Sequence, residues 1–262
     1  MSCKSDHSNQ VSFLNKLYRK KLSIEETQGL IISDKTHAIQ ESIECIKKTR
    51  IELKEYLQRH PSFYYSLNPV EIPKNSPSII KKMAHAAFKA DVGPMAAVAG
   101  ALIDIAFEQM KKTGAKTAVI ENGGEVIAES TQPVYAGIYA GPSPLSGKLA
   151  IKLTQFPIGV ATSSASVSEA LTFGLADAAT ILAENAALAD AAATVACNMV
   201  QGDDCRKSVK KGLSVAGKIE GVIGAIIIRG NYIGSIGDIP ELVSVSGNIK
   251  DVINAQREVN LF

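Results

Sequence analysis

Three features of this 262-residue sequence predict an α/β protein, an α+β layered arrangement in which helices pack against a mixed sheet. Hydrophobic residues make up 46% of the chain, enough to bury one sizeable core or one core with two lobes. Segments with helical periodicity alternate with short runs rich in β-branched residues. An αββ unit, in which a helix is followed by a strand, a turn and a second strand, occurs twice. This order indicates two related halves that share one sheet, with chance similarity of two simple units as the alternative.

Residues 1–76 differ in composition from the rest of the chain, and we expect them to form a strand and helix segment packed on a core formed by residues 77–262. Charged and aromatic residues are more frequent in this first part than in the rest of the chain. Residues 16–33 alternate polar and apolar side chains, as a strand or hairpin does, and residues 36–60 have apolar residues at helical spacing. Prolines between 61 and 77 predict an irregular crossing into the core.

The first αββ unit is expected between residues 78 and 128. Helices are predicted over 78–89 and 95–112, separated by a turn at 91–94, and Gly114 ends the second helix. Strands follow at 118–120 and 126–128, with a turn at Asn122-Gly123-Gly124 between them. Further strands are predicted at 134–140, 149–153 and 158–161.

The second αββ unit is expected between residues 179 and 236. A strand at 179–183 precedes a helix at 185–200, and Asp203 or Asp204 is expected to cap another helix that ends near Gly217. Strands at 221–229 and 232–236 complete this unit. The alanines of both Ala-rich helices are interpreted as close packing positions, so their few polar residues carry the information about function.

Composition argues against several classes of protein. The formal net charge of +2 argues neither for nor against a nucleic-acid partner, but aromatic residues make up only 5% and Trp is absent, so base-stacking surfaces and a nucleic-acid partner are not expected. The chain has no apolar run of signal-peptide length at its start, and its apolar stretches are interrupted by polar residues, so we expect a cytoplasmic protein without a membrane span. The four cysteines form no CxxC pair and are expected to be free thiols. Ala- and Gly-rich surfaces are compatible with a homo-oligomer.

Asp190 and Thr194 are the polar residues that draw attention on the second Ala-rich helix. They are four residues apart, so their side chains share one helix face. A carboxylate and a hydroxyl presented together bind a hard cation such as Mg²⁺. The equally weighted alternative is an exposed aspartate that is favoured near a helix N-terminus by the helix dipole.

Three turns are candidates for contact with a ligand. At Asn122-Gly123-Gly124 the alternatives are a tight hairpin turn and a stretch of bare backbone that a phosphate or ring approaches. Glu121 and Glu125 flank this turn and are poor neighbours for a phosphate without a metal. Residues 91–96 are either an anion site or an ordinary helix start. Residues 161–164 offer three hydroxyls or a simple polar loop.

The order of these segments resembles the ApbE-like superfamily. Its members carry Asp-Leu-Gly-Gly-Ile-Ala, Asn-x-Gly-Gly, Ala-Thr-Ser-Gly and Ala-Asp-Ala followed by Thr, in that order. This chain has Asp-Val-Gly-Pro-Met-Ala at 91–96, Asn-Gly-Gly at 122–124, Ala-Thr-Ser-Ser at 161–164 and Ala-Asp-Ala at 189–191 followed by Thr194. The segments at 93–100, 121–125 and 188–194 look closer to a shorter, soluble branch found in archaea and some bacteria.

The resemblance covers about residues 77–236, and it implies an ApbE-like, T-fold-related architecture and a cofactor site. Superfamily flavin transferases bind FAD, use Mg²⁺ at the pyrophosphate and move FMN onto a Thr or Ser of a partner protein. By motif matching, the side chains of Asp190 and Thr194 and the backbone carbonyl of Ala96 would hold the metal. The cofactor pocket would be lined by Gly93, Met95, Asn122, Gly123, Gly124, Thr162, Ser163 and Ser164. No catalytic residue is assigned.

The chain departs from the flavin transferases at two places. Ala97 stands where they have a Lys, and residues 165–174 contain no His, Pro or Asp to match their His-x-x-Asp-Pro-x-Thr-Gly segment. The soluble branch usually has Gly-His in this stretch, where this chain has Ser168-Glu169.

Three hypotheses about function follow. The first is a Mg²⁺-dependent enzyme that acts on a flavin or other nucleotide, by transfer or by pyrophosphate cleavage. The second is a non-flavin accessory or enzymatic role in sulfide assimilation into homocysteine and cysteine, with which archaeal members are associated. The third is a structural subunit.

Overall fold

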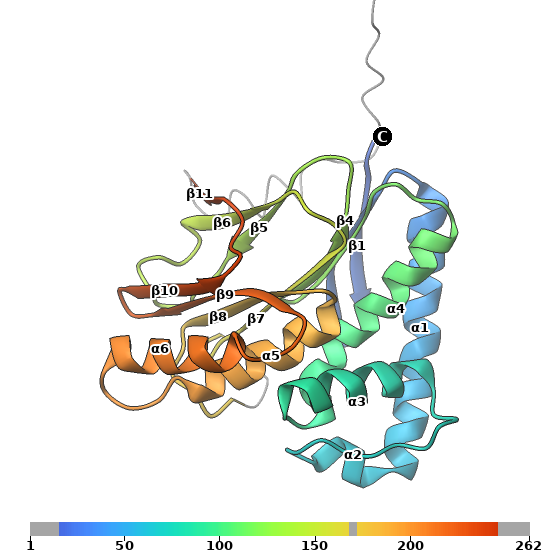
Figure 1. Cartoon of the computed structure of the whole chain (residues 1–262). Helices are drawn as coiled ribbons and strands as arrows, with labels where there is room; N and C mark the ends of the chain where they lie inside the picture. The colour runs from blue at the N-terminus through green and yellow to red at the C-terminus, as the bar shows by residue number, and fades with distance from the viewer. Residues whose placement is uncertain (1–15, 168–171, 246–262) are drawn as a thin grey trace, which may run out of the picture.

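The computed structural model describes residues 16–167 and 172–245, which form three layers (Figure 1). An eight-stranded sheet occupies the middle layer, with helices on one face and a three-stranded sheet on the other. In spatial order the large sheet contains β1 (Tyr18–Ile24), β2 (Thr27–Ser33), β3 (Ala118–Asn122), β4 (Glu125–Glu129), β7 (Ile158–Ser163), β8 (Ala178–Ala183), β9 (Val222–Arg229) and β10 (Tyr232–Gly237). The small sheet contains β11 (Leu242–Ser244), β6 (Leu149–Leu153) and β5 (Val134–Ile138).

The helical layer is built from two groups of helices. Along the chain, the first group connects β2 to β3 and the second connects β8 to β9. The first contains α1 (Thr36–Arg59), α2 (Pro61–Tyr65), α3 (Ser78–Ala90), the 3₁₀ turn η1 (Pro94–Ala97) and α4 (Val98–Lys112); the second contains α5 (Ala186–Met199) and α6 (Cys205–Ala216). The order of hairpin, helices and hairpin therefore occurs twice in the large sheet, once from β1 to β4 and once from β7 to β10.

Every strand pairing within the described residues is antiparallel, so the expected mixed sheet is wrong. The helix groups explain this result. A parallel pair is usually joined through one crossover helix, whereas β8 and β9 are joined through two helices. A second helix returns the chain to the end of the sheet from which it left.

The first hairpin belongs to the large sheet itself, because β2 pairs with β3 in register from Gly29↔Asn122 to Ser33↔Ala118. Leu22, Ile31 and Ile46 are buried in one cluster with side chains of α3 and α4. The boundary expected after residue 76 stays a prediction.

The helix expected over 95–112 is confirmed, with its first turn wound as the 3₁₀ turn η1 and the rest as α4. The change of winding falls at Ala97, which has φ −118° and ψ 9°. The helix expected at 185–200 is confirmed as α5, with Asn185 as its N-cap, and the capping role expected of Asp203 or Asp204 falls to Asp204.

Helices α4 and α5 cross at very short range near their N-termini. A Cβ atom on Gly100 would lie 2.2 Å from the carbonyl oxygen of Ala186. Such contact is possible only where one helix presents no side chain, so Gly100 sets the distance between the two helices. Seven of the alanines of α5 are buried against α4 and the large sheet, which fits the packing role expected of them.

No single helix within residues 16–167 and 172–245 is long and apolar enough to cross a membrane. The bent pair Ser78–Ala90 and Pro94–Lys112 passes the same test together, by length and composition only, with an angle of 107° between its parts.

The Gly100→Ala substitution should destabilise the protein by about 1–3 kcal/mol, because the added methyl group forces the two helices apart. The higher helix propensity of alanine would offset only about 1 kcal/mol of this loss. The free energy of unfolding in urea measures the effect. Gly137→Ala is the matched control, since a Cβ atom at that position meets no other atom within 4 Å. Equal stabilities of the two variants would contradict the close crossing.

Candidate functional site

Asp104 of α4 holds the start of α5. Its Oδ1 atom accepts a hydrogen bond from the Ala186 amide and its Oδ2 atom accepts one from the Ala187 amide, both at 2.9 Å. The Asn185 side chain accepts from the Leu188 amide at 2.9 Å. Two side chains therefore satisfy the first three amides of α5, which have no partner within the helix.

Asp190 of α5 makes the corresponding contact with the start of α4. Its Oδ2 atom accepts a hydrogen bond from the Gly100 amide at 3.0 Å, and the Ala99 amide also stabilises its charged form. Each helix thus supplies an aspartate to the N-terminus of the other. Asp190 is half-buried, so its description as an exposed helix-start aspartate does not hold.

Glu125 lies beside Asp190 and immediately follows the glycine turn. Burial first, and then the negative charge of Asp190, raises the pKa of Glu125. Strand β4 packs against α5, which places the turn and the α5 carboxylate in the same neighbourhood. In the turn itself Gly123 has φ 71° and Gly124 has φ 146°, backbone conformations that favour glycine. The Asn122 side chain accepts a hydrogen bond from the Gln28 amide at 3.2 Å and so ties the turn to the β1–β2 hairpin.

Burial and like charge shape the electrostatics of this neighbourhood. Burial raises the pKa of Asp190 to about 7, against the lowering effect of the α4 amides. Burial likewise raises the pKa of Asp104 to about 6, although two amides favour its charged form. The pKa of Glu125 is raised well above its usual range, by burial first and then by the charge of Asp190. Ionisation of these carboxyl groups is therefore costly, and a bound cation would relieve that cost.

The structure brings several of the candidate residues together. Turn η1, which contains Met95 and Ala96, packs against α5, which carries Asp190 and the half-buried Thr194 one turn later. Residues 122–124 lie next to the same helix, because β4, which begins at Glu125 directly after them, packs against α5. These segments are far apart in sequence, so only the fold makes them neighbours.

Strand β7 divides its candidate residues between the two faces of the large sheet. Side chains alternate across β7, with Val160 in the core beneath the small sheet and Ala161 in the core beneath the helices, so Thr162 faces the small sheet. Its hydroxyl is 2.9 Å from that of Thr180 on the same side. By the same alternation Ser163 faces the helices.

The hydroxyl of Ser164 closes a local turn, because it accepts hydrogen bonds from the Ser166 and Val167 amides at 3.2 Å. Gly93 allows close packing, since a Cβ atom there would lie 1.9 Å from the Ser66 carbonyl oxygen. Ser168-Glu169 and Cys3 fall outside the described residues.

Two residues of this neighbourhood were absent from the candidate set. Glu125 was recognised only as an unsuitable neighbour for a phosphate, and Asp104 belongs to no motif. A signal for Asp104 exists in the sequence, because it is an acidic residue in an otherwise small and apolar helix segment. Its partner is a helix start 82 residues away, which no local pattern identifies.

The groups near Asp190 that could bind a metal ion are carboxylate and hydroxyl oxygens. No group of three or more His, Cys, Asp or Glu side chains in residues 16–167 and 172–245 is arranged to hold a metal ion. Cys45, Cys197 and Cys205 are free thiols. Cys197 is fully buried on α5, with its sulfur 3.4 Å from the Thr172 hydroxyl.

Comparison with known proteins agrees with this architecture. A family model described as "AbpE bacteria" matches residues 12–218. The chain belongs to this ApbE-like family. A UPF0280 protein of Methanococcus maripaludis strain S2 is 37% identical over 247 residues, which cover 91% of this chain and 100% of the relative. A UPF0280 protein of Methanocaldococcus jannaschii is 36% identical over 236 residues, 88% of this chain and 96% of the relative.

Two solved structures show that the fold is ApbE-like. The ApbE protein of Thermotoga maritima matches with a TM-score of 0.53 and 16% identity, over 84% of this chain and 96% of that one. The flavinyl transferase ApbE of Pseudomonas stutzeri, in its apo form, matches with a TM-score of 0.50 and 12% identity, over 84% and 94%. At these identities the likeness concerns the fold alone.

The Asp104→Ala substitution should lower the free energy of unfolding by about 2–4 kcal/mol, because it leaves two buried amides without partners. Urea denaturation followed by circular dichroism measures the loss. Asp204→Ala is the control, since the Asp204 side chain accepts one hydrogen bond, from the Lys207 amide, at an exposed helix start. A loss no larger than that of the control would show that Asp104 does not hold α5.

The stability of the protein should fall as pH rises from about 4 to about 7. Asp104 and Asp190 have folded-state pKa values of about 6 and about 7, raised from 3.8. An acid with a raised pKa binds its proton more tightly in the folded state. Its contribution to the free energy of unfolding is therefore complete below pH 3.8, the unfolded pKa, and is lost as the pH rises past the folded pKa. Free energies of unfolding across this range should vary less in Asp104→Asn and Asp190→Asn. A parent profile that rises with pH would contradict the assignment.

Proposed function

We propose that this ApbE-like protein binds Mg²⁺ together with a phosphate-bearing nucleotide of the flavin type, between the 122–124 turn and α5. The observation that carries the proposal is the pair of carboxylates, Glu125 and Asp190, whose charges act on each other beside a turn of bare backbone. Two carboxylates in this relation are stable when they share a proton or a cation. A divalent cation would also offset the repulsion between the glutamates that flank the turn and the phosphate of a ligand.

The residues present fit Mg²⁺ on chemical grounds. Asp190, Glu125 and Thr194 offer only oxygen atoms, which this ion prefers. Magnesium is usually bound through one or two carboxylates, waters and the phosphates of its substrate, so a third carboxylate is not required. The amides of α4 occupy part of the Asp190 carboxylate and fix its orientation, which leaves its remaining lone pairs for the ion.

The chain's own residues would have separate roles around such a ligand. Asp190 and Thr194 would hold the ion from α5, with Glu125 approaching from β4. Gly123 presents no side chain, and a Cβ atom there would meet nothing within 4 Å, so a phosphate can approach its backbone. When bound, Mg²⁺ supplies neutralisation of the negative charge that develops on a leaving phosphate.

Binding without transfer is the second candidate, and Ala97 favours it. The superfamily transferases have a Lys at the matching position, whereas Ala97 is completely buried and brings no amine to the site. An accessory role, such as one in sulfide assimilation, would then use the pocket without cleaving its ligand. Cys197 contributes no accessible thiol to such a role, because it is fully buried.

Addition of Mg²⁺ and FAD together should raise the melting temperature of the purified protein by about 5–10 °C at a hundredfold excess over the dissociation constant. Glu125→Gln and Asp190→Asn should each remove most of this shift, because each removes a negative charge from the cation. The shift should also shrink from about pH 8 to about pH 6, since protonation of Asp190 competes with the ion. Differential scanning calorimetry measures all three effects.

Glu121→Gln is the matched control for this experiment. Glu121 flanks the same turn and burial raises its pKa too, but side-chain alternation along β3 places it on the other face of the sheet from Ile120. This variant should keep most of the response to Mg²⁺. A full parental response in both Glu125→Gln and Asp190→Asn would refute the metal assignment.

Chromatography of the same mixture separates the two candidates. Cleavage of the FAD pyrophosphate releases AMP, whether FMN passes to a hydroxyl or to water. Stoichiometric or catalytic AMP in the presence of Mg²⁺ would support an enzyme, and intact FAD in a stabilised complex would support binding alone.

A further inference from the structure

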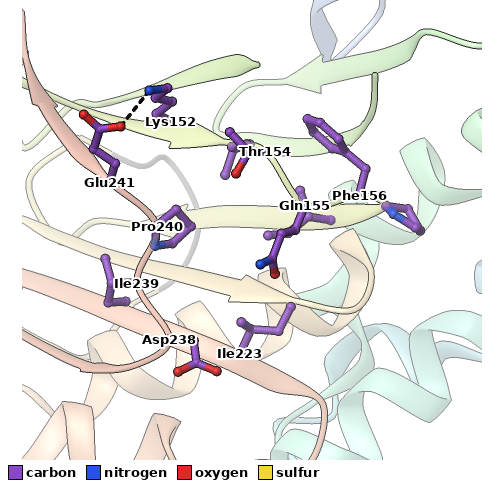
Figure 2. Close-up of a pocket in the computed structure, with 12 residues that line it drawn as sticks. Lys152, Thr154, Gln155, Phe156, Ile223, Asp238, Ile239, Pro240 and Glu241 are labelled. Carbon is purple, nitrogen blue, oxygen red and sulfur yellow. Dashed lines mark hydrogen bonds and ion pairs between the residues drawn. The ribbon is translucent and has the colours of Figure 1, made fainter. Parts of the chain in front are cut away.

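A cavity lies on the face of the large sheet opposite to the Asp190 site. Its volume is about 440 Å³, and it opens where β6 ends and where β7 and β9 begin (Figure 2). Leu153, Ile158 and Ile239 of its lining belong to the core between the two sheets. The candidate site, in contrast, lies on the helical side.

Three segments build the walls of this cavity. Lys152 and the connection 154–157 form one wall, Ile223 of β9 forms the floor, and residues 238–241 form the opposite wall. The walls are fixed to each other by backbone hydrogen bonds. The Lys152 amide donates to the Glu241 carbonyl at 2.9 Å, and the Asp238 amide donates to the Ile223 carbonyl at 2.9 Å. The cavity is therefore part of the folded framework.

The lining combines an apolar surface with uncommitted polar groups. Ile223 is 37% exposed and lies with Ile239 and Pro240 around the cavity. The side chains of Thr154 and Gln155 make no hydrogen bond within the described part of the chain. Figure 2 shows the Gln155 amide between the Lys152 side and the Asp238 side of the cavity.

The charges of the lining are unbalanced. The Nζ atom of Lys152 lies 2.7 Å from Oε2 of Glu241, and this pairing raises the pKa of Lys152, which therefore stays charged. Asp238 forms no ion pair among residues 16–167 and 172–245 and lies on the side of the cavity away from Lys152. Two carboxylates against one ammonium leave an excess of one negative charge.

We propose that this cavity binds a small organic cation, an amine carried by an apolar body. The apolar body would cover Ile223, Ile239 and Pro240, and the ammonium group would be attracted by Asp238 and hydrogen-bonded by Gln155. The cavity has the size of pockets that take small molecules, and such pockets combine apolar walls with a few placed polar groups. An anionic ligand of the same shape would be repelled.

Three indoles of one shape and different charge test this proposal: tryptamine, tryptophol and indole-3-acetate. The affinity of each indole for the intact protein can be measured from perturbation of protein amide NMR signals. Tryptamine should bind about tenfold more tightly than indole-3-acetate, and tryptophol should have an intermediate affinity. The perturbed signals should come from residues 152–158 and 238–241. Asp238→Asn should weaken tryptamine about threefold to fivefold and leave tryptophol unchanged.

Two further variants serve as controls. Glu220→Gln removes an exposed carboxylate that does not line the cavity, and Asp190→Asn alters only the site on the helical face; both should bind tryptamine as the parent does. Failure of all three indoles to bind at millimolar concentration would overturn the proposal, as would a preference for indole-3-acetate. Tryptamine binding that is lost in Asp190→Asn and kept in Asp238→Asn would assign the amine to the other site and equally overturn it.

Discussion

The crossing of α4 and α5 at their N-termini is the constraint on which the candidate site depends. Gly100 lets the two backbones touch, and the touching ends are places where amides lack partners. Asp104 and Asp190 satisfy those amides reciprocally, each from the other helix. The carboxylates are buried by the contact that they stabilise, so burial raises the pKa of both groups. The close packing of the two helices is therefore also the cause of the raised carboxyl pKa values in this region.

This arrangement gives Asp190 a structural role as well as a candidate ligand role. Both carboxylate oxygens of Asp104 accept hydrogen bonds from amides at the start of α5. Asp190 retains capacity beyond the α4 amides and has a second carboxylate, Glu125, as its neighbour. The difference between two similarly placed aspartates lies in what surrounds them. The proposed magnesium site follows from that difference, which the ApbE-like motif alone does not reveal.

The large sheet divides the molecule into two chemical environments. On its helical face two carboxyl groups lie beside a glycine turn, and on the other face a partly apolar cavity opens between two sheets. Alternation along a single strand assigns residues to one side or the other, as Ala161 and Thr162 show. A contiguous sequence motif such as residues 161–164 can therefore supply groups to both faces, and motif matching treats it as one unit.

The sequence by itself determined the elements whose signals are local. Periodicity located α1, α3 and α5, glycine turns located the β3–β4 and β9–β10 hairpins, and the Asp204 cap located α6, because each signal acts within a few residues. Local patterns missed the short elements α2 and β11 and assigned a mixed sheet, since strand direction depends on how many helices intervene. Only the tertiary structure paired Asp104 with α5, Asp190 with α4, and Glu125 with Asp190. Those contacts join residues 60 to 90 positions apart, and long-range packing, which has no local sequence pattern, decides them.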